Sequence, residues 1–330
     1  MIDINNIIDA YEVLAGVVRE TPVLSSETVN SEMGVNLYLK AECNQINGSF
    51  KSRGAYFAMH QYFQKNEKND VVAFSSGNHA QGVAYSANLM GVKATIIMPE
   101  DTPKTKIQKT ESLGAKIIFY DRYNESRETI AKKIAIETGA FLIPAYDHYD
   151  VISGQGTVAL EAINQMALIG EGIDYFICPV GGGGLIAGCS VAIKHYFKQS
   201  NIIGVEPELF NDTQLSLKKG KRVSIDINQN TLCDALMAKT PGELTFPINQ
   251  EYITEVATVN EEEIKSAMRY AFKEFNIVVE PGGIVSLAFA LRHRFSIENA
   301  NILILLSGGN VDSDRFDELI NPSTATNIKL

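Results

Sequence analysis

Short apolar segments alternate with longer segments of helical periodicity through most of this chain. In the first half, the apolar segments are residues 71–74, 94–98, 116–119 and 141–143. The helical stretches between them are residues 81–90, 104–113 and 127–138. A strand, a crossover helix and a second strand form a parallel pair, and the crossover helices cover both faces of the sheet. The alternation therefore predicts an α/β fold with twisted, parallel-type sheets.

The alternation extends on both sides of this central part. A helical stretch at residues 4–18 and a strand at 36–43 precede it. Helices at 157–168, 185–197 and 261–275 and strands at 175–180, 202–206 and 301–306 follow it. Residues 207–256 are less regular and are expected to be rich in loops. Because parallel α/β sheets place their sites at the carboxyl ends of strands, functional residues are expected in the loops that follow strands.

Charge and cysteine content disfavour several classes of protein. The net charge is −10 at pH 7, which disfavours nucleic acid or an anionic membrane as the main partner. The apolar runs are too short to cross a bilayer, and the N-terminus lacks the basic region of a signal peptide. The cysteines form no CxxC pair, so they are expected to be buried free thiols; they are Cys43, Cys178, Cys189 and Cys233. The chain is therefore expected to be cytoplasmic.

Four consecutive glycines follow the strand at 175–180, and a helix begins directly after them at Leu185. They are Gly181, Gly182, Gly183 and Gly184. A glycine run costs backbone entropy, and it is expected where backbone N–H groups must approach an anion closely. The dipole of the following helix also favours an anion at this point. The segment therefore predicts a phosphate-binding loop.

The kind of phosphate is left open by this loop alone. Gly182, Gly184 and Ala187 fit the pattern GxGxxA, and Glu206 ends the next strand. This arrangement is typical of dinucleotide-binding units. An NAD-dependent oxidoreductase is therefore an alternative interpretation.

Two further segments carry chemistry at the starts of helices. Lys51 opens a helix, where the dipole disfavours a cation and favours the neutral amine that a Schiff base requires. Taken alone, a lysine is more often a solvated surface charge. Residues 75–82, SSGNHAQG, follow the strand at 71–74 and offer several donors that suit a carboxylate. Their alternative interpretation is a helix cap with a polar turn.

Three segments resemble the serine/threonine dehydratase and serine racemase family of fold type II enzymes, which use pyridoxal 5'-phosphate (PLP). They are SFKSRGA at 49–55, SSGNHAQG at 75–82 and PVGGGGL at 179–185. Further matching segments are RETP at 19–22, SGQGT at 153–157, GVEP at 204–207 and LSGGN at 306–310. The resemblance covers nearly the whole chain in the correct order, whereas the oxidoreductase interpretation explains only the glycine loop.

The resemblance implies a role for each matching residue. Lys51 would carry PLP as a Schiff base, Phe50 would pack beside the pyridine ring, and Asn78 would bond the phenolic oxygen. Ser307 would face the pyridine nitrogen. The phosphate would lie against Gly181, Gly182, Gly183, Gly184 and the N–H group of Leu185. The substrate would contact the loop of Ser75, Ser76, Gly77, Asn78 and His79, and also Arg127.

The implied activity is that of an ammonia-lyase, which dehydrates serine, threonine or 3-hydroxyaspartate to a 2-oxo acid and ammonia. The amine of Lys51 would remove the Cα proton, and the neutral Ser307 hydroxyl would favour loss of the β-hydroxyl group. Ser76 matches a serine that exchanges the Cα proton on the opposite face in serine racemases. Racemisation of serine or an aspartate-type substrate is therefore the alternative, and dehydration is the expected main activity.

Glu206, Phe210 and Asp212 match the divalent-cation site of the family, for Mg²⁺, Ca²⁺ or Mn²⁺. Three departures from the family also count. Ile46-Asn47 replaces the lysine-threonine pair of the nucleotide-responsive racemases, so nucleotide activation is not expected. Residues 233–239 carry alanines where racemases often have a glycine and a serine. The resemblance places this loop near the substrate's side chain, so 3-hydroxyaspartate or a bulkier 3-hydroxy acid is a candidate substrate beside serine. No regulatory domain is expected after Leu330.

The resemblance further implies two domains with PLP in the cleft between them. Residues 1–68 and 149–330 would form the large domain, and residues 69–148 a small, mobile domain. Closure of the small domain would exclude water and bring Ser76 and Arg127 to the substrate. A homodimer is the expected assembly.

Overall fold

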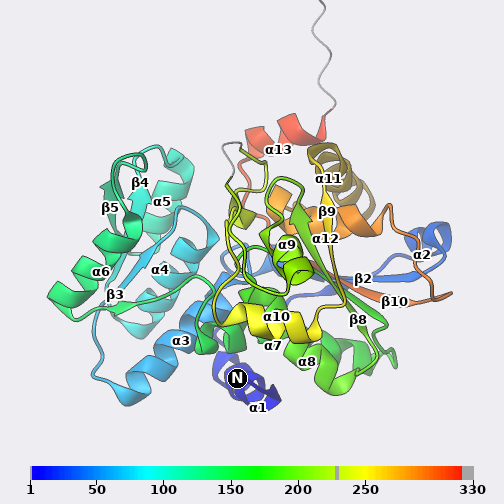
Figure 1. Cartoon of the computed structure of the whole chain (residues 1–330), viewed down its shortest axis with the longest axis horizontal. Helices are drawn as coiled ribbons and strands as arrows, with labels where there is room; N and C mark the ends of the chain where they lie inside the picture. Colours follow the sequence, from blue (N-terminus) through cyan, green and yellow to red (C-terminus); the bar gives the residue numbers. More distant parts are fainter. Residues whose placement is uncertain (1, 227–229, 322–330) are drawn as a thin grey trace, which may run out of the picture.

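A computed structural model describes residues 2–226 and 230–321. Leu330, the position after which no regulatory domain is expected, lies outside the described residues. Figure 1 shows two sheets side by side, each covered by helices. The predicted α/β class with parallel-type sheets is confirmed.

The larger sheet has six strands in the order β1-β2-β10-β7-β8-β9. They are β1 (Val23–Leu24), β2 (Asn36–Ala41), β7 (Tyr175–Pro179), β8 (Asn201–Pro207), β9 (Glu255–Val259) and β10 (Asn301–Leu306). Only the short β1 runs antiparallel to its neighbour, β2. Ile302 pairs with Leu37 on one side and Tyr175 on the other, so the last strand lies at the centre of the sheet.

The smaller sheet has four strands in the order β5-β4-β3-β6, and all its pairs are parallel. They are β3 (Val71–Phe74), β4 (Ala94–Pro99), β5 (Lys116–Tyr120) and β6 (Phe141–Leu142). The helices α4 (Asn78–Met90), α5 (Lys104–Ser112) and α6 (Arg127–Thr138) connect them. All of these elements lie within residues 69–148. The movement of this unit as a separate domain stays a prediction.

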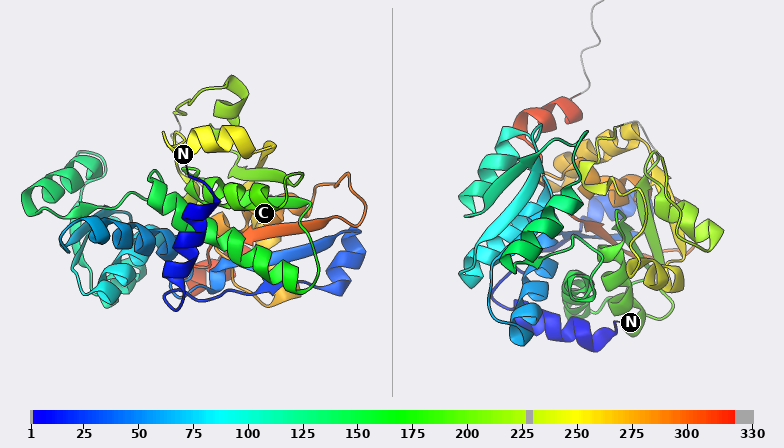
Figure 2. Two further views of the ribbon diagram at one scale, coloured as in Figure 1. Left: turned by 90° about the horizontal axis from the view of Figure 1, so that it is seen from below. Right: turned by 60° about the vertical axis from the view of Figure 1, so that its left-hand side comes forward.

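Helices cover both faces of the larger sheet. One buried cluster joins the sheet to α1 (Ile4–Leu14), α7 (Tyr149–Leu168), α8 (Gly184–Tyr196) and α10 (Thr245–Tyr252). A second cluster, on the other face, joins it to α2 (Glu27–Met33), α11 (Glu261–Phe275), α12 (Pro281–Ala290) and α13 (Ser313–Ile320). In the left view of Figure 2, α1 lies across the outer side of α7.

The helix α3 (Lys51–Lys65) connects the two halves of the molecule, because it packs against α4 on one side and α7 on the other. Its first residue is the predicted cofactor lysine. A loop runs from the end of β2 through the short 3-10 helix η1 (Glu42–Asn44) to the start of α3. This loop and the first turn of α3 therefore reach the site from the junction of the two sheets.

The structure differs from the predicted elements in three places. The expected helix at 157–168 begins earlier, at Tyr149, and contains the SGQGT segment. The region expected to be loop-rich contains α9 (Asp212–Lys219), the 3-10 helix η2 (Asp234–Leu236), α10 and the start of β9. The N-terminal helix ends at Leu14 instead of residue 18. Glycines within α7 and short amphipathic helices hide the periodicity on which such predictions depend.

Two further expectations concern burial. The four cysteines are free and buried, as predicted. In the described part of the chain, none of the helices combines the length and the apolar character that crossing a membrane requires.

Candidate active site

Lys51 begins α3 and is partly buried. Its Nζ donates to the Ala145 carbonyl at 3.1 Å and lies 5.0 Å from the centroid of the Phe50 ring. Burial lowers the pKa of the Lys51 amine to about 8, although the carboxyl group of Glu280 acts in the opposite direction. An amine with this pKa is partly deprotonated near neutral pH and can attack an aldehyde.

The glycine loop joins β7 to α8, and its backbone requires glycine. Gly183 has a φ of 91°, in the left-handed region. A Cβ atom on Gly182 would lie 2.4 Å from the ring of Tyr146, and one on Gly183 would lie 2.5 Å from Nδ2 of Asn249. The Thr245 hydroxyl donates to the Gly182 carbonyl at 2.8 Å and holds the loop from outside.

The N–H groups of this loop are free to bind an anion. Within residues 2–226 and 230–321, the backbone N–H groups from Gly181 to Leu185 donate to no protein acceptor, and the loop bonds through its carbonyls. Gly183 caps α8 without a side-chain hydrogen bond. A row of free N–H groups at a helix N-terminus fits the phosphate of PLP.

The serine loop joins β3 to α4. Ser75 and Ser76 are partly buried, and the Ser75 hydroxyl accepts from the Gly77 N–H at 3.2 Å. The His79 ring, in contrast, is buried, and its Nε2 lies 3.1 Å from the Ile143 carbonyl. Burial lowers the pKa of His79 to about 3, so the ring is neutral and donates to that carbonyl. The Nε2 of the His79 ring is therefore committed to the Ile143 carbonyl, whereas its buried Nδ1 has no hydrogen-bond partner within the described residues.

Two residues that the sequence reasoning did not single out hold Asn78 in place. The Asn78 Nδ2 donates to Oε1 of Glu280 at 2.6 Å, and its Oδ1 accepts from Nδ2 of Asn310 at 2.7 Å. Burial is the main cause that raises the pKa of Glu280 to about 8, and the charge of Asp234 adds to it. Asn310 ends the LSGGN segment, so that motif contained a signal for its position.

Ser307 follows β10 and is buried close to the start of α3. The Phe50 N–H donates to the Ser307 carbonyl at 3.4 Å, and Ser49 forms an antiparallel bridge with Gly308. The end of the central strand of the larger sheet therefore lies against the backbone of Phe50, the residue directly before Lys51. The prediction that Ser307 faces the pyridine nitrogen of PLP stays a prediction.

Arg127 lies farther out than the other predicted site residues. It begins α6, its side chain is 49% exposed, and its Nε donates to Glu128 at 2.9 Å. The guanidinium carbon stands 5.3 Å from the ring centroid of Phe74, the residue directly before the serine loop. Arg127 is thus near the serine loop, and its side chain is about half exposed.

Glu206 and Asp212 are both buried near the end of β8, with the backbone of Phe210 between them in the chain. Glu206 accepts from the N–H groups of Thr213 and Gln214, each at 2.9 Å, while Oδ2 of Asp212 has no partner within the described residues. Burial raises the pKa of Glu206 to about 8 and of Asp212 to about 7. The unpartnered oxygen fits a cation, although two carboxylates fall short of the three-residue groups typical of a metal centre.

Besides the packing of α4 on α3, the small-sheet unit contacts the larger half through α5. Lys106 pairs with Asp234, and Lys109 bonds Asn310. The Thr105 hydroxyl donates to Asp312 at 3.0 Å. A pocket of about 230 Å³ lies between the two halves, and residues of this contact and Glu280 line it.

Comparison with known proteins gives consistent matches over almost the whole chain. Residues 14–308 match the family described as pyridoxal-phosphate dependent enzyme. The chain is 40% identical to an L-threo-3-hydroxyaspartate ammonia-lyase of Saccharomyces cerevisiae, over 96% of this chain and 95% of the relative. It is 39% identical to a serine racemase of Schizosaccharomyces pombe, over 96% and 97%.

The fold comparison agrees. A structure of maize serine racemase superimposes with a TM-score of 0.89 at 37% identity and covers 94% of both chains. The matched region includes the Lys51 segment, the serine loop and the glycine loop, whereas the oxidoreductase alternative explained the glycine loop alone. This chain therefore belongs to the family of pyridoxal-phosphate-dependent enzymes and has the fold type II architecture.

Proposed function

We propose that the protein is an ammonia-lyase that dehydrates a small 3-hydroxy amino acid and releases a 2-oxo acid and ammonia. The observation that carries this proposal is the Lys51 amine at the start of α3, where burial lowers its pKa to about 8. The backbone contact of Phe50 with Ser307 and the free N–H groups of the glycine loop support it. The similarity to ammonia-lyases at 40% identity supports the reaction class. Serine, threonine and 3-hydroxyaspartate are the candidate substrates.

Each site residue has a proposed task. Lys51 holds the cofactor covalently, and its freed amine removes the Cα proton of the substrate. Phe50 packs beside the ring, Asn78 donates to the phenolic oxygen, and Ser307 faces the ring nitrogen. Bound PLP supplies an electron sink for the charge left at Cα. Gly181, Gly182, Gly183, Gly184 and Leu185 hold the phosphate.

The assignment of Lys51 is tested by colour and by one variant. The purified protein should absorb in the Schiff-base band, and Lys51→Ala should remove this band while the fold stays intact by circular dichroism. A wild-type protein that remains colourless after addition of PLP would contradict the proposal. A protein that binds PLP but turns over no hydroxy-amino acid would instead be a binding module.

Racemisation is the second candidate activity, and Ser76 favours it. Ser76 lies on the loop before α4 and is partly buried. The similarity to serine racemases supports this alternative. If Ser76 is the second base, Ser76→Ala should abolish inversion and spare elimination. Equal loss of both activities would make Ser76 a binding residue only.

The substrate's carboxylate is proposed to bind the loop of Ser75, Ser76, Gly77, Asn78 and His79, through backbone N–H groups and the serine hydroxyls. Arg127 is proposed to reach a second carboxylate, which favours 3-hydroxyaspartate over serine. L-serine, D-serine, L-threonine and the 3-hydroxyaspartates should be compared for 2-oxo acid, ammonia and inverted enantiomer. Arg127→Met should weaken turnover of 3-hydroxyaspartate more than of serine.

A divalent cation is proposed to bind Glu206, Asp212 and the Phe210 carbonyl. The unpartnered buried oxygen of Asp212 supports the proposal. A cation that binds only the folded state stabilises it, by about 2.7 kcal/mol at a hundredfold excess over its dissociation constant. Mg²⁺, Ca²⁺ or Mn²⁺ should raise the melting temperature of the wild type and not of Asp212→Asn. Equal shifts in both proteins would place the cation elsewhere.

A cytoplasmic location and a homodimer complete the proposal. The buried free thiols support a reducing compartment. Sedimentation velocity across a concentration series distinguishes a dimer from a monomer of 36.2 kDa.

A further inference from the structure

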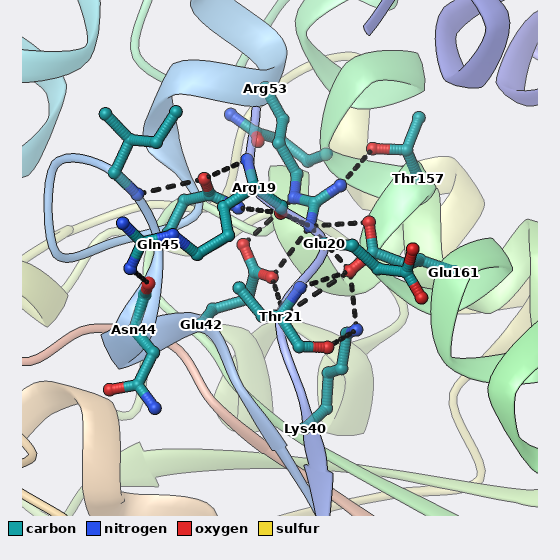
Figure 3. A network of polar contacts seen from close by, with 12 residues as sticks. Arg19, Glu20, Thr21, Lys40, Glu42, Asn44, Gln45, Arg53, Thr157 and Glu161 are labelled. Carbon is teal, nitrogen blue, oxygen red and sulfur yellow. Dashed lines mark hydrogen bonds and ion pairs between the residues drawn. The ribbon is translucent and has the colours of Figure 1, made fainter. Parts of the chain in front are cut away.

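A buried ion network lies behind the first turn of α3 (Figure 3). It contains two cations, Lys40 and Arg53, and two carboxylates, Glu42 and Glu161, and none of these side chains is more than 4% exposed. Charges taken out of water this completely require close partners. The two cations balance the two carboxylates, so the network is neutral as a whole.

One half of the network closes the loop that carries the cofactor lysine. The Arg53 Nε donates to Oε2 of Glu42 at 2.9 Å, and its Nη2 donates to Oε1 at 2.8 Å. Such a bidentate pair fixes orientation as well as distance. Glu42 stands where the loop leaves β2, and Arg53 stands in the first turn of α3. Phe50 and Lys51 lie between the two ends of this clamp.

Arg53 acts on Lys51 only through the backbone. Residues two positions apart in a helix point to opposite sides. The Lys51 amine reaches the Ala145 carbonyl, whereas the Arg53 guanidinium faces α7, where it bonds Thr157 at 3.3 Å and Glu161 at 3.0 Å. The guanidinium therefore fixes the back of the helix turn whose front presents the amine.

The other half of the network is centred on Lys40 and shares the Glu161 carboxylate with Arg53. The Lys40 amine donates to the Glu161 carboxylate at 2.6 Å, to the Thr21 carbonyl at 2.7 Å and to the Gln165 side chain at 2.8 Å. These bonds join β2 and the N-terminal segment to α7. Both halves lie in the same buried environment, and their charges together sum to zero. Only the Arg53–Glu42 pair joins the two ends of the loop that carries Lys51.

We propose that the Arg53–Glu42 clamp is the positioning device for the reactive amine: it fixes the distance between the Lys51 amine and the glycine loop. The proposal rests on the proposed function, in which Lys51 carries the cofactor and the glycine loop holds its phosphate. With both ends of the cofactor bound at a set separation, covalent attachment becomes an intramolecular step. Arg53 and Glu42 are thus positioning residues and touch no reacting atom.

The test compares two double variants of the same network. Arg53→Met with Glu42→Gln opens the clamp, whereas Lys40→Met with Gln165→Leu leaves both carboxylate partners of Arg53, Glu42 and Glu161, in place. Each protein is stripped of cofactor and mixed with PLP, and covalent attachment is followed by absorbance, borohydride trapping and peptide mapping to Lys51. Urea unfolding of the same samples shows whether the two variants have lost comparable stability.

The clamp variant should attach PLP roughly 10- to 100-fold more slowly than the wild type, since small misplacements of reacting groups cost rates of this order. The Lys40 variant should stay within about threefold of the wild type. Pyridoxal lacks the phosphate and gains nothing from a fixed separation. Its attachment rate should therefore be similar in all three proteins, so that the preference for PLP over pyridoxal collapses in the clamp variant alone.

Equal slowing in the two double variants, or an unchanged preference for PLP in the clamp variant, would overturn the inference. If the clamp variant does not fold, Arg53→Lys takes its place, because it keeps the charge and loses the bidentate contact. If Arg53→Lys prefers PLP over pyridoxal as strongly as the wild type does, the inference is likewise overturned. A wild type in which PLP attaches to a residue other than Lys51 would overturn the proposed function instead.

Discussion

At the scale of single residues, Lys51 gives the most direct link between burial and chemistry. Burial lowers the pKa of its amine to about 8 from an ordinary value of 10.5. Only the neutral amine attacks an aldehyde, so covalent attachment of PLP to the cofactor-free protein should accelerate with pH and level off above about pH 8. Stopped-flow absorbance between pH 6 and 10 measures this profile.

A profile that keeps rising toward pH 10.5 would show that the amine is not perturbed. Free lysine mixed with PLP under the same conditions provides the unperturbed reference. Lys51→Ala serves as the blank, because it removes the attachment point.

The buried His79 ring leads to a prediction about the pH dependence of stability. Burial lowers its pKa to about 3 from 6.5, so the folded state binds fewer protons than the unfolded state between these values. The free energy of unfolding should therefore be fully retained above about pH 6.5 and should fall as the pH drops below it. Its pH slope should be smaller in His79→Gln by about 1.4 kcal/mol per pH unit, the value for one proton. Urea unfolding between pH 5 and 7 measures both slopes, and parallel slopes would contradict the assignment.

At the scale of elements, the glycine loop separates a binding role from a folding role. Gly183→Ala forces a side chain into the left-handed region and against Asn249, so it should weaken PLP binding by tenfold or more, a value of about 1.4 kcal/mol or above. Gly170 offers a matched control, because its φ is 77° and its surroundings are open. Gly170→Ala should cost about 1–2 kcal/mol of stability and leave PLP affinity unchanged. Fluorescence titration of the cofactor-free proteins distinguishes the two, and equal affinities would contradict the role of the loop.

The helices and strands also show which parts of the fold could be predicted from the sequence. Strands such as β3 and β10 are buried on both faces, so their continuous apolar runs predicted them correctly. The helix α7 was predicted to begin eight residues late, 157 against 149, because Gly154 and Gly156 resemble a turn. In the structure, Gly154 lies against the backbone of Arg53 and Gly54, and Gly156 against that of Gly188. These two glycines allow α7 to pack closely on its neighbouring helices. A single sequence does not show which helices will pack together, so this role of the glycines could not be predicted.

At the scale of the whole molecule, the motifs indicated the candidate site residues but not the residues that hold them in place. Lys51, the serine loop and the glycine loop could be singled out because each lies where a strand or loop meets a helix, whereas Ser307 was predicted only from the resemblance of the LSGGN segment. Glu280 and Asn310, which hold Asn78, come from positions more than 200 residues away in the chain. Their partnership depends on the order of strands in the larger sheet, which brings β10 beside β2. Such long-range pairings are set by the assembled core and leave no local periodicity.

The contact between the two halves of the molecule leads to a prediction about closure. Lys106 on α5 pairs with Asp234 across the junction, and both side chains are partly exposed. We expect residues 69–148 to move as a unit, so Lys106→Met should favour the open arrangement and raise KM for the amino acid while cofactor affinity is unchanged. A partly exposed ion pair contributes up to about 1 kcal/mol, which limits the change to roughly fivefold.

Lys104 provides the matched control, since it lies on the same helix and is exposed. Lys104→Met should leave KM unchanged. Because salt screens exposed pairs, high ionic strength should raise the KM of the wild type toward that of Lys106→Met and so remove the difference between them. Steady-state kinetics at low and high salt measure both effects. A difference that persists at high salt would mean that Lys106 acts on the substrate itself, and closure would then have to depend on the Thr105–Asp312 and Lys109–Asn310 contacts.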